Sequence, residues 1–434
     1  MFLTLFLIII SAFILAHGAP TPRNMEKWQR FATDFDCPED GYDSIFRQFG
    51  AFRRLLSDED WRLLQKGDIQ RDFQYAEACG LAHIRIKDGS ASLLSSHSST
   101  IEFVVKDMMR DVFGPLSSYL PDMDFLFNTM DAPAYLPHHP GVDYFGEPPS
   151  FTADKHDPYF LALLNSERCH DASISAKTMR HLHQYFHVGH RSPVLHRPFR
   201  TPILSHSSIL NCFHDILFPT WHSRHKFPFS QKQMVPWDEK NNTLIWRGSL
   251  TGADLWDVEL TKTSHRVRFI TYGQNVMSWI NKTNASMVPI DAAFTDSIIA
   301  DENKKREIEQ LFPPADFMTP QEQLKYKYIM MIDGWTFNER LYEFLSSGSL
   351  LFRAHIFDEW YEDMLKPWVH YVPVRFDLSD LSEKLLWARN HDEEARQISE
   401  NARILSLRYL NPKFHKCYSM RMLLEYATHV EVVV

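Results

Sequence analysis

The run Tyr326-Lys-Tyr-Ile-Met-Met-Ile332 is an apolar segment that ends at Asp333-Gly334. A helix-like segment follows with Arg340 near its start, and a second apolar run, Leu350-Leu-Phe352, comes after Ser346-Ser-Gly-Ser349. A strand that stops at Asp-Gly before a helix is typical of half a nucleotide-binding α/β unit. Ligands of such units bind at the carboxyl ends of the strands, beside helix N-termini. The stretch therefore predicts a layered α/β sheet with a ligand at one edge.

Two arginines follow apolar runs in this part of the chain. Arg340 suits a diphosphate, because its planar fork can hold two oxygens at once. Trp246-Arg-Gly-Ser249, with Thr251 just after, follows the strand-like Thr243-Leu-Ile245, and a glycine with hydroxyls behind a strand can cradle phosphate. An ordinary turn with a salt-bridged arginine is the alternative. Two arginines that converge on one ligand can neutralise a diphosphate leaving group without metal.

The organisation of the 434-residue chain predicts an α/β fold with two domains. Residues from about 24 to 115 have helical patterns, and 121–127 runs into a strand. Strands and helices alternate from 243 to about 373, and helical spacing of apolar residues returns from 378 to 409. The expected units are a signal segment (1–19), an N-terminal domain (20–215), an α/β ligand-binding domain (216–390) and a C-terminal helical segment (391–434).

Composition limits the partners. The hydrophobic fraction is 44% and the formal net charge is −9, which indicates a globular protein without the basic field that recruits nucleic acid. The aromatic fraction of 14% suits sugar rings, although most aromatic residues are expected in the core.

The first residues are expected to direct the chain to the secretory pathway. Phe2 to Ala16 is almost wholly apolar and ends in small residues before Pro20, as in a secretory signal peptide. An uncleaved anchor through residues 2–16, giving a type II membrane protein, is the alternative. N-glycosylation sequons begin at Asn241, Asn281 and Asn284. The expected location is the lumen of the Golgi or endoplasmic reticulum, or secretion.

The cysteines are Cys37, Cys79, Cys169, Cys212 and Cys417, and none forms a Cys-x-x-Cys pair. A zinc cluster is therefore not expected. In an oxidising lumen up to two disulfides can form, leaving one thiol, and the spacing does not determine the pairing.

Several polar residues are candidates for chemistry in the N-terminal half. Asp131 lies just past the 121–127 strand and could act as a general base, although an aspartate before alanine and proline also suits a turn. Asp122 and Asp124 form a DxD pair of the kind that holds a divalent ion in metal-dependent sugar transferases. His183 and His187 have helical i, i+4 spacing but lack the other parts of a zinc site.

These residues together resemble glycosyltransferase family 90, which includes fungal capsule-associated proteins and animal Rumi-type protein O-glucosyltransferases. The resemblance covers about residues 118 to 410. It rests on ordered motifs: Pro121-Asp-Met123 with Asn128, Asp131 and Pro133, then Trp246-Arg-Gly-Ser249, then 325–349, Glu359-Trp360, Pro367-Trp-Val-His-Tyr-Val-Pro373 and Asp377-Leu-Ser-Asp-Leu381. The Trp246 and Asp-Gly motifs are closer to the fungal branch.

The resemblance implies a two-domain GT-B-like fold with Rossmann-like sheets, in which 20–215 is the acceptor-side domain and 216–390 is the UDP-sugar-binding domain. It also implies inverting transfer of glucose or xylose from a UDP-sugar to a glycan or protein hydroxyl, with no metal or other cofactor. Asp131 falls on the family's catalytic base, and Arg247, Ser249 and Arg340 fall on positions that hold the donor diphosphate. The family usually has serine two residues before this arginine, where Asn338 stands here.

The full donor-binding set expected from strand ends and from the resemblance is Arg247, Ser249, Thr251, Asp333, Gly334, Asn338, Arg340, Ser347, Gly348 and Glu359. Two other classes of protein stay open at this point. One is a metal-dependent transferase that uses Asp122 and Asp124. The other is a non-catalytic carbohydrate-binding protein that has kept the fold.

Overall fold

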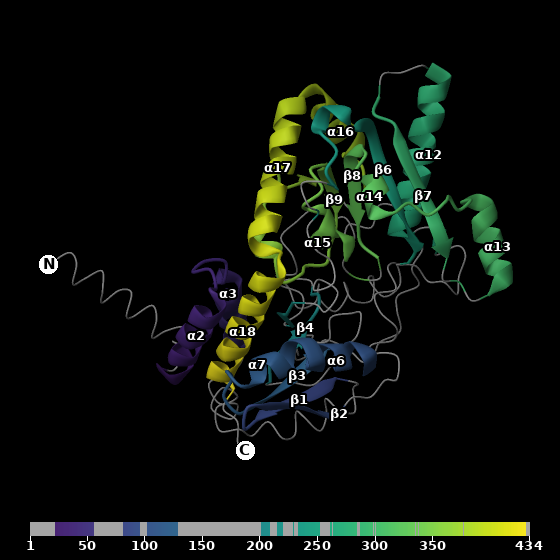
Figure 1. Cartoon of the computed structure of the whole chain (residues 1–434). Coiled ribbons are helices and arrows are strands. Elements are labelled where there is room, and N and C mark those ends of the chain that lie inside the picture. Colours follow the sequence, from purple (N-terminus) through teal and green to yellow (C-terminus); the bar gives the residue numbers. More distant parts are fainter. Residues whose placement is uncertain are drawn as a thin grey trace.

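The computed structural model describes residues 22–55, 81–95, 102–128, 201–208, 215–219, 229, 233–251, 261–262, 264–283, 287–297, 299, 301–334, 336, 338–375 and 377–430. Two sheets form one above the other, and the long helices at the C-terminus run along one side of both (Figure 1). The predicted α/β fold with two sheets is confirmed. Five predictions from the sequence concern residues outside these ranges: the signal segment, Asp131, Asn284, the His183–His187 pair, and the cysteines Cys79, Cys169 and Cys212.

The second sheet is parallel throughout its described strands. Its order is β10-β9-β8-β6-β7. The strands are β6 (Asn241–Leu250), β7 (Ile290–Ser297), β8 (Tyr326–Ile332), β9 (Leu350–Ala354) and β10 (Val372–Pro373). β8 is buried along almost its whole length, as expected of a strand with helices on both faces. The apolar run that ends at Asp333-Gly334 is therefore a central strand.

The order of these strands creates a topological switch point between β6 and β8. The chain leaves β6 for its neighbour β7 on one side, whereas it leaves β8 for β9 on the other side. Helices that start from β6 and β8 therefore diverge, and the carboxyl ends of these two strands border a crevice. Ligands of open α/β sheets bind in this crevice.

Helices cover this sheet and extend from it. α12 (His265–Thr283) connects β6 to β7 and packs on β7. The other helices of this half are η3 (Trp237–Glu239), α13 (Glu302–Leu311), α14 (Pro320–Gln323), α15 (Arg340–Phe344), η4 (Glu362–Met364), α16 (Leu381–Asn390) and α17 (Asp392–Tyr409). Helix α14 begins with a complete capping box between Thr319 and Glu322.

The first sheet is mixed, with the order β2-β1-β3-β4-β5. Its strands are β1 (Ala82–Lys87), β2 (Ser90–Ser95), β3 (Met123–Asn128), β4 (Ile203–Ser205) and β5 (Ile216–Leu217). β3 confirms the strand expected near 121–127. Parallel pairing of β3, β4 and β5 contrasts with the antiparallel pairs that β1 makes with β2 and β3. β5 is part of this sheet, so residues 216–217 pair with the N-terminal half.

The prediction that residues 24 to 115 are helical is wrong for the β1–β2 hairpin. Asp88 and Gly89 form its two-residue loop, both with positive φ (50° and 73°), which suits the primed turns of tight hairpins. The flanking helices are α2 (Pro22–Phe35), α3 (Asp43–Leu55), α6 (Glu102–Met108), the π-helix η1 (Met109–Phe113) and α7 (Gly114–Ser117). The Asp88-Gly89 pair is the feature of the sequence that could have predicted the hairpin.

The last helix, α18 (Pro412–His429), returns to the N-terminal half and packs against α2 and α3. Figure 1 shows it beside these helices, with α17 beside the second sheet. A disulfide joins Cys37 to Cys417 across this contact, and Tyr418 shares a hydrogen bond of 2.7 Å with Ser44. Each large side chain buried here, such as Phe414, adds about 1.5–3 kcal/mol. These contacts therefore join α18 to the helices that precede the first sheet.

Asp122 and Asp124 are engaged by separate structural partners. The Asp124 carboxylate accepts hydrogen bonds from Arg85 Nε (2.7 Å) and Nη2 (2.6 Å), and Asp122 accepts one from the backbone N–H of Asp88 (3.0 Å). Burial raises the pKa of Asp124, but the hydrogen bonds from Arg85 and His83 outweigh it and hold that pKa below its ordinary value. Both carboxylates thus stabilise the hairpin at the start of β3.

Within the described residues, no helix has both the length and the apolar character needed to cross a bilayer.

Candidate active site

A pocket of about 520 Å³ lies at the switch point, where β6 and β8 end. Its lining residues come from the ends of these strands, from α12, β7, α14 and α15, from the loop before α14 and from the segment between β8 and α15. They are Arg247, Gly248, Ser249, Thr251, Arg266, Thr295, Phe317, Met318, Pro320, Gln323, Gly334, Thr336, Asn338, Glu339, Arg340 and Glu343. Six residues of the predicted donor-binding set therefore meet in one pocket: Arg247, Ser249, Thr251, Gly334, Asn338 and Arg340.

The two predicted arginines are linked through the backbone of β6. Arg340 Nη1 donates a hydrogen bond to the carbonyl oxygen of Arg247. Arg247 donates through Nη2 to the carboxylate of Asp291 on β7, 3.0 Å to Oδ2 and 2.8 Å to Oδ1. Burial lowers the pKa of Arg340 to about 10, so its guanidinium stays charged at neutral pH. The two predicted guanidinium groups therefore enter one pocket, Arg247 from β6 and Arg340 from the start of α15.

Gly248 is required by close packing beneath the pocket. A Cβ at this position would lie 2.8 Å from the ring of Trp246, which is fully buried. A side chain at 248 would therefore displace either the buried Trp246 ring or the strand that carries Arg247 and Ser249. This explains the glycine in the Trp246-Arg-Gly-Ser249 motif.

Asn338 connects the end of β8 to the start of α15. Its Nδ2 donates to the carbonyl of Ile332 (3.0 Å), and its Oδ1 accepts from the backbone N–H of Arg340 (3.1 Å). The side chain uses both a donor and an acceptor, which a single amide can supply at once. The residue that departs from the family's usual serine thus helps to place Arg340.

Asp333 is buried and holds the turn after β9. Its Oδ2 accepts hydrogen bonds from the backbone N–H groups of Ile356 (2.7 Å) and Phe357 (3.3 Å). Burial raises the pKa of this carboxyl to about 7, although those hydrogen bonds act in the opposite direction. Asp333 does not line the pocket, so the structure gives it a supporting position.

Three further members of the predicted set also lie outside the pocket lining. Ser347 Oγ accepts from the backbone N–H of Ser349 (3.2 Å), and Gly348 has a φ of +62° with no room for a Cβ beside Met234. The Glu359 carboxylate accepts from the hydroxyl of Tyr361 (2.5 Å), and burial raises the pKa of Glu359 to about 8. Their part in donor binding stays a prediction.

Arg266, in the first turn of α12, is the main pocket residue that the sequence analysis missed. Its Nε donates to the carbonyl of Asp333 (3.0 Å) and its Nη1 to the carbonyl of Ser249 (2.7 Å). The sequence could have indicated Arg266, because it lies in the first turn of the helix that follows the Gly-Ser-x-Thr segment. Glu339 and Glu343 also line the pocket, and their carboxylates can accept hydrogen bonds from sugar hydroxyls. No motif in the sequence distinguishes these two glutamates from surface glutamates.

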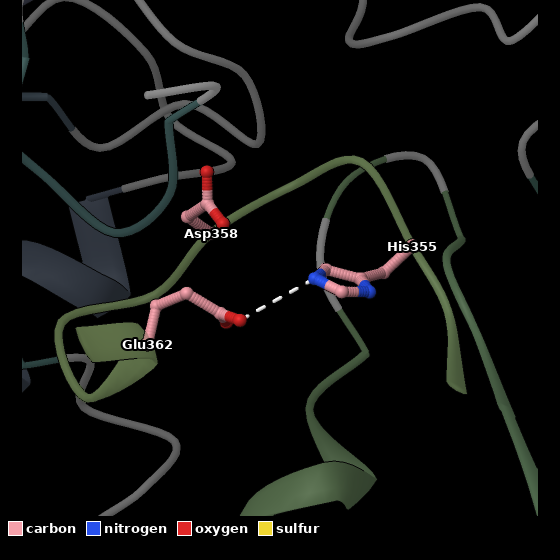
Figure 2. A group of neighbouring side chains, drawn as sticks. All are labelled: His355, Asp358 and Glu362. Carbon is pink, nitrogen blue, oxygen red and sulfur yellow. Dashed lines mark ion pairs between the residues drawn. The ribbon is translucent and has the colours of Figure 1, made fainter. Parts of the chain in front are cut away.

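A second polar group lies on the segment after β9. Figure 2 shows His355, Asp358 and Glu362, which place one imidazole nitrogen and two carboxylate oxygens within 4.8 Å of one another. Both oxygens of Glu362 accept from the guanidinium of Arg353 (2.7 and 2.8 Å), and His355 Nε2 lies 3.3 Å from Oε1. Burial raises the pKa of Glu362, but Arg353 and His355 outweigh it and hold that pKa well below its ordinary value. The carboxylate is thus neutralised within the protein.

Asp358 also connects the two halves. Its backbone N–H donates to the carbonyl of Ser208 (2.7 Å), and its carbonyl accepts from the N–H of Ser208 (3.1 Å). Ser208 follows β4 of the first sheet, so this bridge fixes the segment after β9 to that sheet. The network around Glu362 therefore stabilises the junction between the halves.

The chain is similar to proteins of animals and of iridescent viruses. Over 249 residues it is 28% identical to protein O-glucosyltransferase 1 of Bos taurus, with 52% of this chain and 57% of the relative covered. Over 193 residues it is 30% identical to protein O-glucosyltransferase 2 of Danio rerio, with 44% and 33% covered. Over 219 residues it is 33% identical to uncharacterized protein 179R of Invertebrate iridescent virus 6, with 46% and 17% covered. The matched part is therefore less than two thirds of each relative's length.

The family itself is shown by a match to more than half of the chain. The sequence model of glycosyl transferase family 90 covers residues 188–434. This range includes the whole second sheet and every residue of the pocket lining. The chain belongs to glycosyl transferase family 90.

Proposed function

We propose that this protein transfers a sugar, glucose or xylose, from a UDP-sugar to a hydroxyl group of a protein acceptor, with inversion at the anomeric carbon. The observation that carries the proposal is the pocket at the switch point, where Arg247 and Arg340 lie together with Ser249 and Thr251. Two guanidinium groups and two hydroxyls at adjacent strand ends suit a nucleotide diphosphate. Family membership and the names of the O-glucosyltransferase relatives support sugar transfer to protein.

The proposed reaction is a single in-line displacement. Asp131 takes the proton of the acceptor hydroxyl while that oxygen forms a bond to the anomeric carbon. The bond from this carbon to the diphosphate oxygen breaks, and its electron pair leaves with UDP. Arg340 and Arg247 stabilise the charge that grows on the diphosphate, which removes the need for a metal ion. A general base of this kind contributes about 10²–10⁴-fold to the rate.

The proposed location is the lumen of the secretory pathway. The Cys37–Cys417 disulfide requires an oxidising compartment. The side chains of Asn241 and Asn281 are exposed, so both sequons are accessible to glycosylation. A shift to higher mobility on treatment of the secreted or microsomal protein with an N-glycosidase would support this location, and an unglycosylated cytosolic protein would contradict it.

The function is tested by UDP release from UDP-glucose and UDP-xylose in EDTA, with the full-length chain and its Asp131→Asn variant. We expect donor-selective release by the wild type and a loss of about 10²–10⁴-fold in the variant, with UDP binding retained. Equal rates for the two proteins would exclude Asp131 as the base. Activity that appears only with manganese would contradict the metal-independent mechanism. Binding of UDP without turnover, in the presence of candidate acceptor proteins, would favour a binding protein.

A further inference from the structure

Trp368, in the turn before β10, has a backbone conformation that large side chains rarely adopt. Its φ is +62°, in the left-handed region where the Cβ of a bulky residue is crowded. Among the described residues other than glycine that have a positive φ, it is the one aromatic residue. Such strain persists where the surrounding contacts impose it, and it is concentrated at functional sites. The conformation of Trp368 therefore points to a function for its side chain.

Hydrogen bonds within the turn hold Trp368 in this conformation. Its backbone N–H donates to the carbonyl of Tyr371 (2.8 Å). The N–H of His370 donates to the carbonyl of Lys366 (3.0 Å), and the N–H of Lys366 donates to His370 Nδ1 (3.0 Å). Burial lowers the pKa of His370, and the charge of Lys366 lowers it further, so Nδ1 keeps the lone pair that accepts this bond at neutral pH. The indole is therefore fixed before a ligand binds, and little conformational freedom would be lost on binding.

The indole that this turn holds is part of a row of rings on the surface. Trp368 is 44% exposed and lies edge-to-face with the half-buried Trp387 of α16, with centroids 4.8 Å apart and planes at 83°. Trp387 in turn stacks on the exposed ring of His391, at 5.4 Å and 15°. We call Trp368, Trp387 and His391 the aromatic row. Exposed aromatic rings offer a flat apolar surface to a ligand.

The aromatic row lies away from the donor pocket. β10 runs parallel to β9, and the turn with Trp368 comes before its first residue. The pocket lies where β6 and β8 end, so the turn is at the opposite edge of the same sheet. Figure 1 shows α16, which carries Trp387, at the end of the second half that is farthest from the first sheet. A ligand of the row would therefore not compete with the nucleotide.

A positively charged hydrogen-bond donor stands beside the row. Lys384 Nζ lies 5.8 Å from the centroid of the Trp368 ring, and it donates to the carbonyl of Pro373 and to the carboxylate of Asp380. An ammonium has three donors, so these two bonds leave one for a ligand. A pyranose ring has C–H groups on its face, which an indole can cover, and hydroxyls at its border, which such a donor can bind. Apolar rings with a few placed polar groups are the usual lining of a small-ligand site.

We propose that the aromatic row binds a neutral oligosaccharide, with one sugar ring stacked on Trp368 and a hydroxyl of that ring bonded to Lys384. The size of the row argues against a protein partner. A stable protein interface buries about 800 Å² on each partner, whereas the apolar surface here is limited to a few side chains and is bordered by the exposed, charged Lys366 and Glu383. A sugar ring needs an area no larger than an indole.

Calorimetric titration of the full-length protein with maltohexaose, cellohexaose and mannohexaose tests this inference. We expect the wild type to bind at least one of them at millimolar concentration, also in the presence of excess UDP. Trp368→Ala should weaken this binding about ten-fold or more, because the stacking surface is lost. UDP affinity should not change, because Trp368 lies at the opposite edge of the sheet from the pocket.

Trp279→Ala is the matched control. Trp279 is 49% exposed but lies on α12, which packs on β7 at the other end of the strand order, so its loss should leave oligosaccharide binding unchanged. Trp368→Gly is the second variant of the proposed site. It should also lose oligosaccharide binding, but it should unfold at a higher temperature than Trp368→Ala, because glycine adopts a positive φ without strain.

Two kinds of result would overturn the inference. One is a wild type that binds none of the three oligosaccharides, or binding that neither Trp368 variant weakens. The other is self-association of the wild type that Trp368→Ala abolishes, without oligosaccharide binding, which would identify the row as an interface between copies of this chain. Both results are independent of the proposed sugar transfer, because they do not involve the pocket at the ends of β6 and β8.

Discussion

Arginine side chains are buried both in the pocket and in the network around Glu362, but the groups that accept their hydrogen bonds differ in charge. In the network, Arg353 donates to both oxygens of Glu362, a carboxylate that carries the opposite charge. In the pocket, Arg266 and Arg340 donate to backbone carbonyls, which are neutral. The third arginine of the pocket, Arg247, pairs with the carboxylate of Asp291, but that side chain is 42% exposed and not buried as Glu362 is. Both regions lie at the carboxyl side of the same sheet, one after β9 and the other after β6 and β8.

This difference separates a structural arginine from a ligand-binding one. A guanidinium that is paired with a buried carboxylate has its charge compensated before any ligand arrives, and removing one partner leaves the other buried and unpaired. A guanidinium that donates to carbonyls, as Arg340 does, is oriented but keeps its positive charge, so it can still bind an anion. Substitutions in the network should therefore change stability, and substitutions in the pocket should change binding and rate.

The largest expected effect is on stability, from Arg353→Met. Loss of this arginine leaves the carboxylate of Glu362 buried without its main partner, which should lower the free energy of unfolding by about 3–5 kcal/mol. Chemical denaturation measures the change. UDP affinity of the folded fraction should stay the same.

The double variant Arg353→Met, Glu362→Leu is the control for this prediction. Removing both charges should restore most of the lost stability, because neither is then buried alone. If Arg353→Met alone keeps wild-type stability but loses UDP binding, the network around Glu362 has a binding role and not the structural role assigned to it.

The next effect is on rate, from Arg340→Gln. Loss of a charge that stabilises the departing diphosphate should slow sugar transfer by about 10²–10³-fold. The free energy of unfolding should fall by only about 1 kcal/mol, from the lost bond to the Arg247 carbonyl. Steady-state rates with UDP-glucose and UDP-xylose measure the change. Arg340→Lys, which keeps the positive charge but not the planar guanidinium, shows how much of the loss comes from charge and how much from geometry. A wild-type rate in Arg340→Gln would remove this residue from the mechanism.

A smaller effect concerns pH, because the pKa values of two buried carboxyl groups, Asp333 beside the pocket and Glu362 in the network, shift in opposite directions. Burial raises the pKa of Asp333 to about 7, so the folded state binds its proton more tightly than the unfolded state does. Stability from this group is fully present below about pH 4 and is lost as pH rises toward 7. The lowered pKa of Glu362 gives the reverse, with stability present above the ordinary glutamate pKa and lost in acid.

Urea denaturation between pH 4 and 8 measures this difference in the wild type and in Asp333→Asn. The variant should lose less stability than the wild type as pH rises from 4 to 7, because asparagine has no proton to release. Identical pH profiles would show that the Asp333 carboxyl is not perturbed by its burial.

The smallest effect is expected from Asn338→Ser, which restores the residue that the family usually has here. Serine can replace either the bond to the Ile332 carbonyl or the bond from the Arg340 N–H, but its shorter side chain does not span both. The KM for the UDP-sugar should rise by less than about tenfold, the equivalent of one hydrogen bond. A much larger loss would mean that Asn338 contacts the donor itself.

The sequence predicted the second sheet well because its strands are continuous apolar runs that end in distinct polar motifs. Tyr326–Ile332 followed by Asp-Gly is such a run, and the motif after Thr243–Ile245 is another. In a parallel sheet all carboxyl ends meet at one edge, so the positions of Arg247 and Arg340 after two such runs are enough to predict that they lie together.

The rest depended on contacts that no local pattern encodes. Arg266 reaches the pocket because α12 starts beside β6 and β8, and the order of these strands is not visible in the sequence. Ser347 lies between α15 and β9, and Glu359 follows β9, but their side chains bond to neighbouring residues instead of lining the pocket. The return of α18 to α2 and α3 joins residues as far apart as Cys37 and Cys417.

A crystal structure of the protein with UDP tests the central claim most directly. The account predicts the diphosphate between the carboxyl ends of β6 and β8, within hydrogen-bond distance of Arg340 and Arg247. UDP bound elsewhere, or a diphosphate that contacts neither guanidinium, would contradict it.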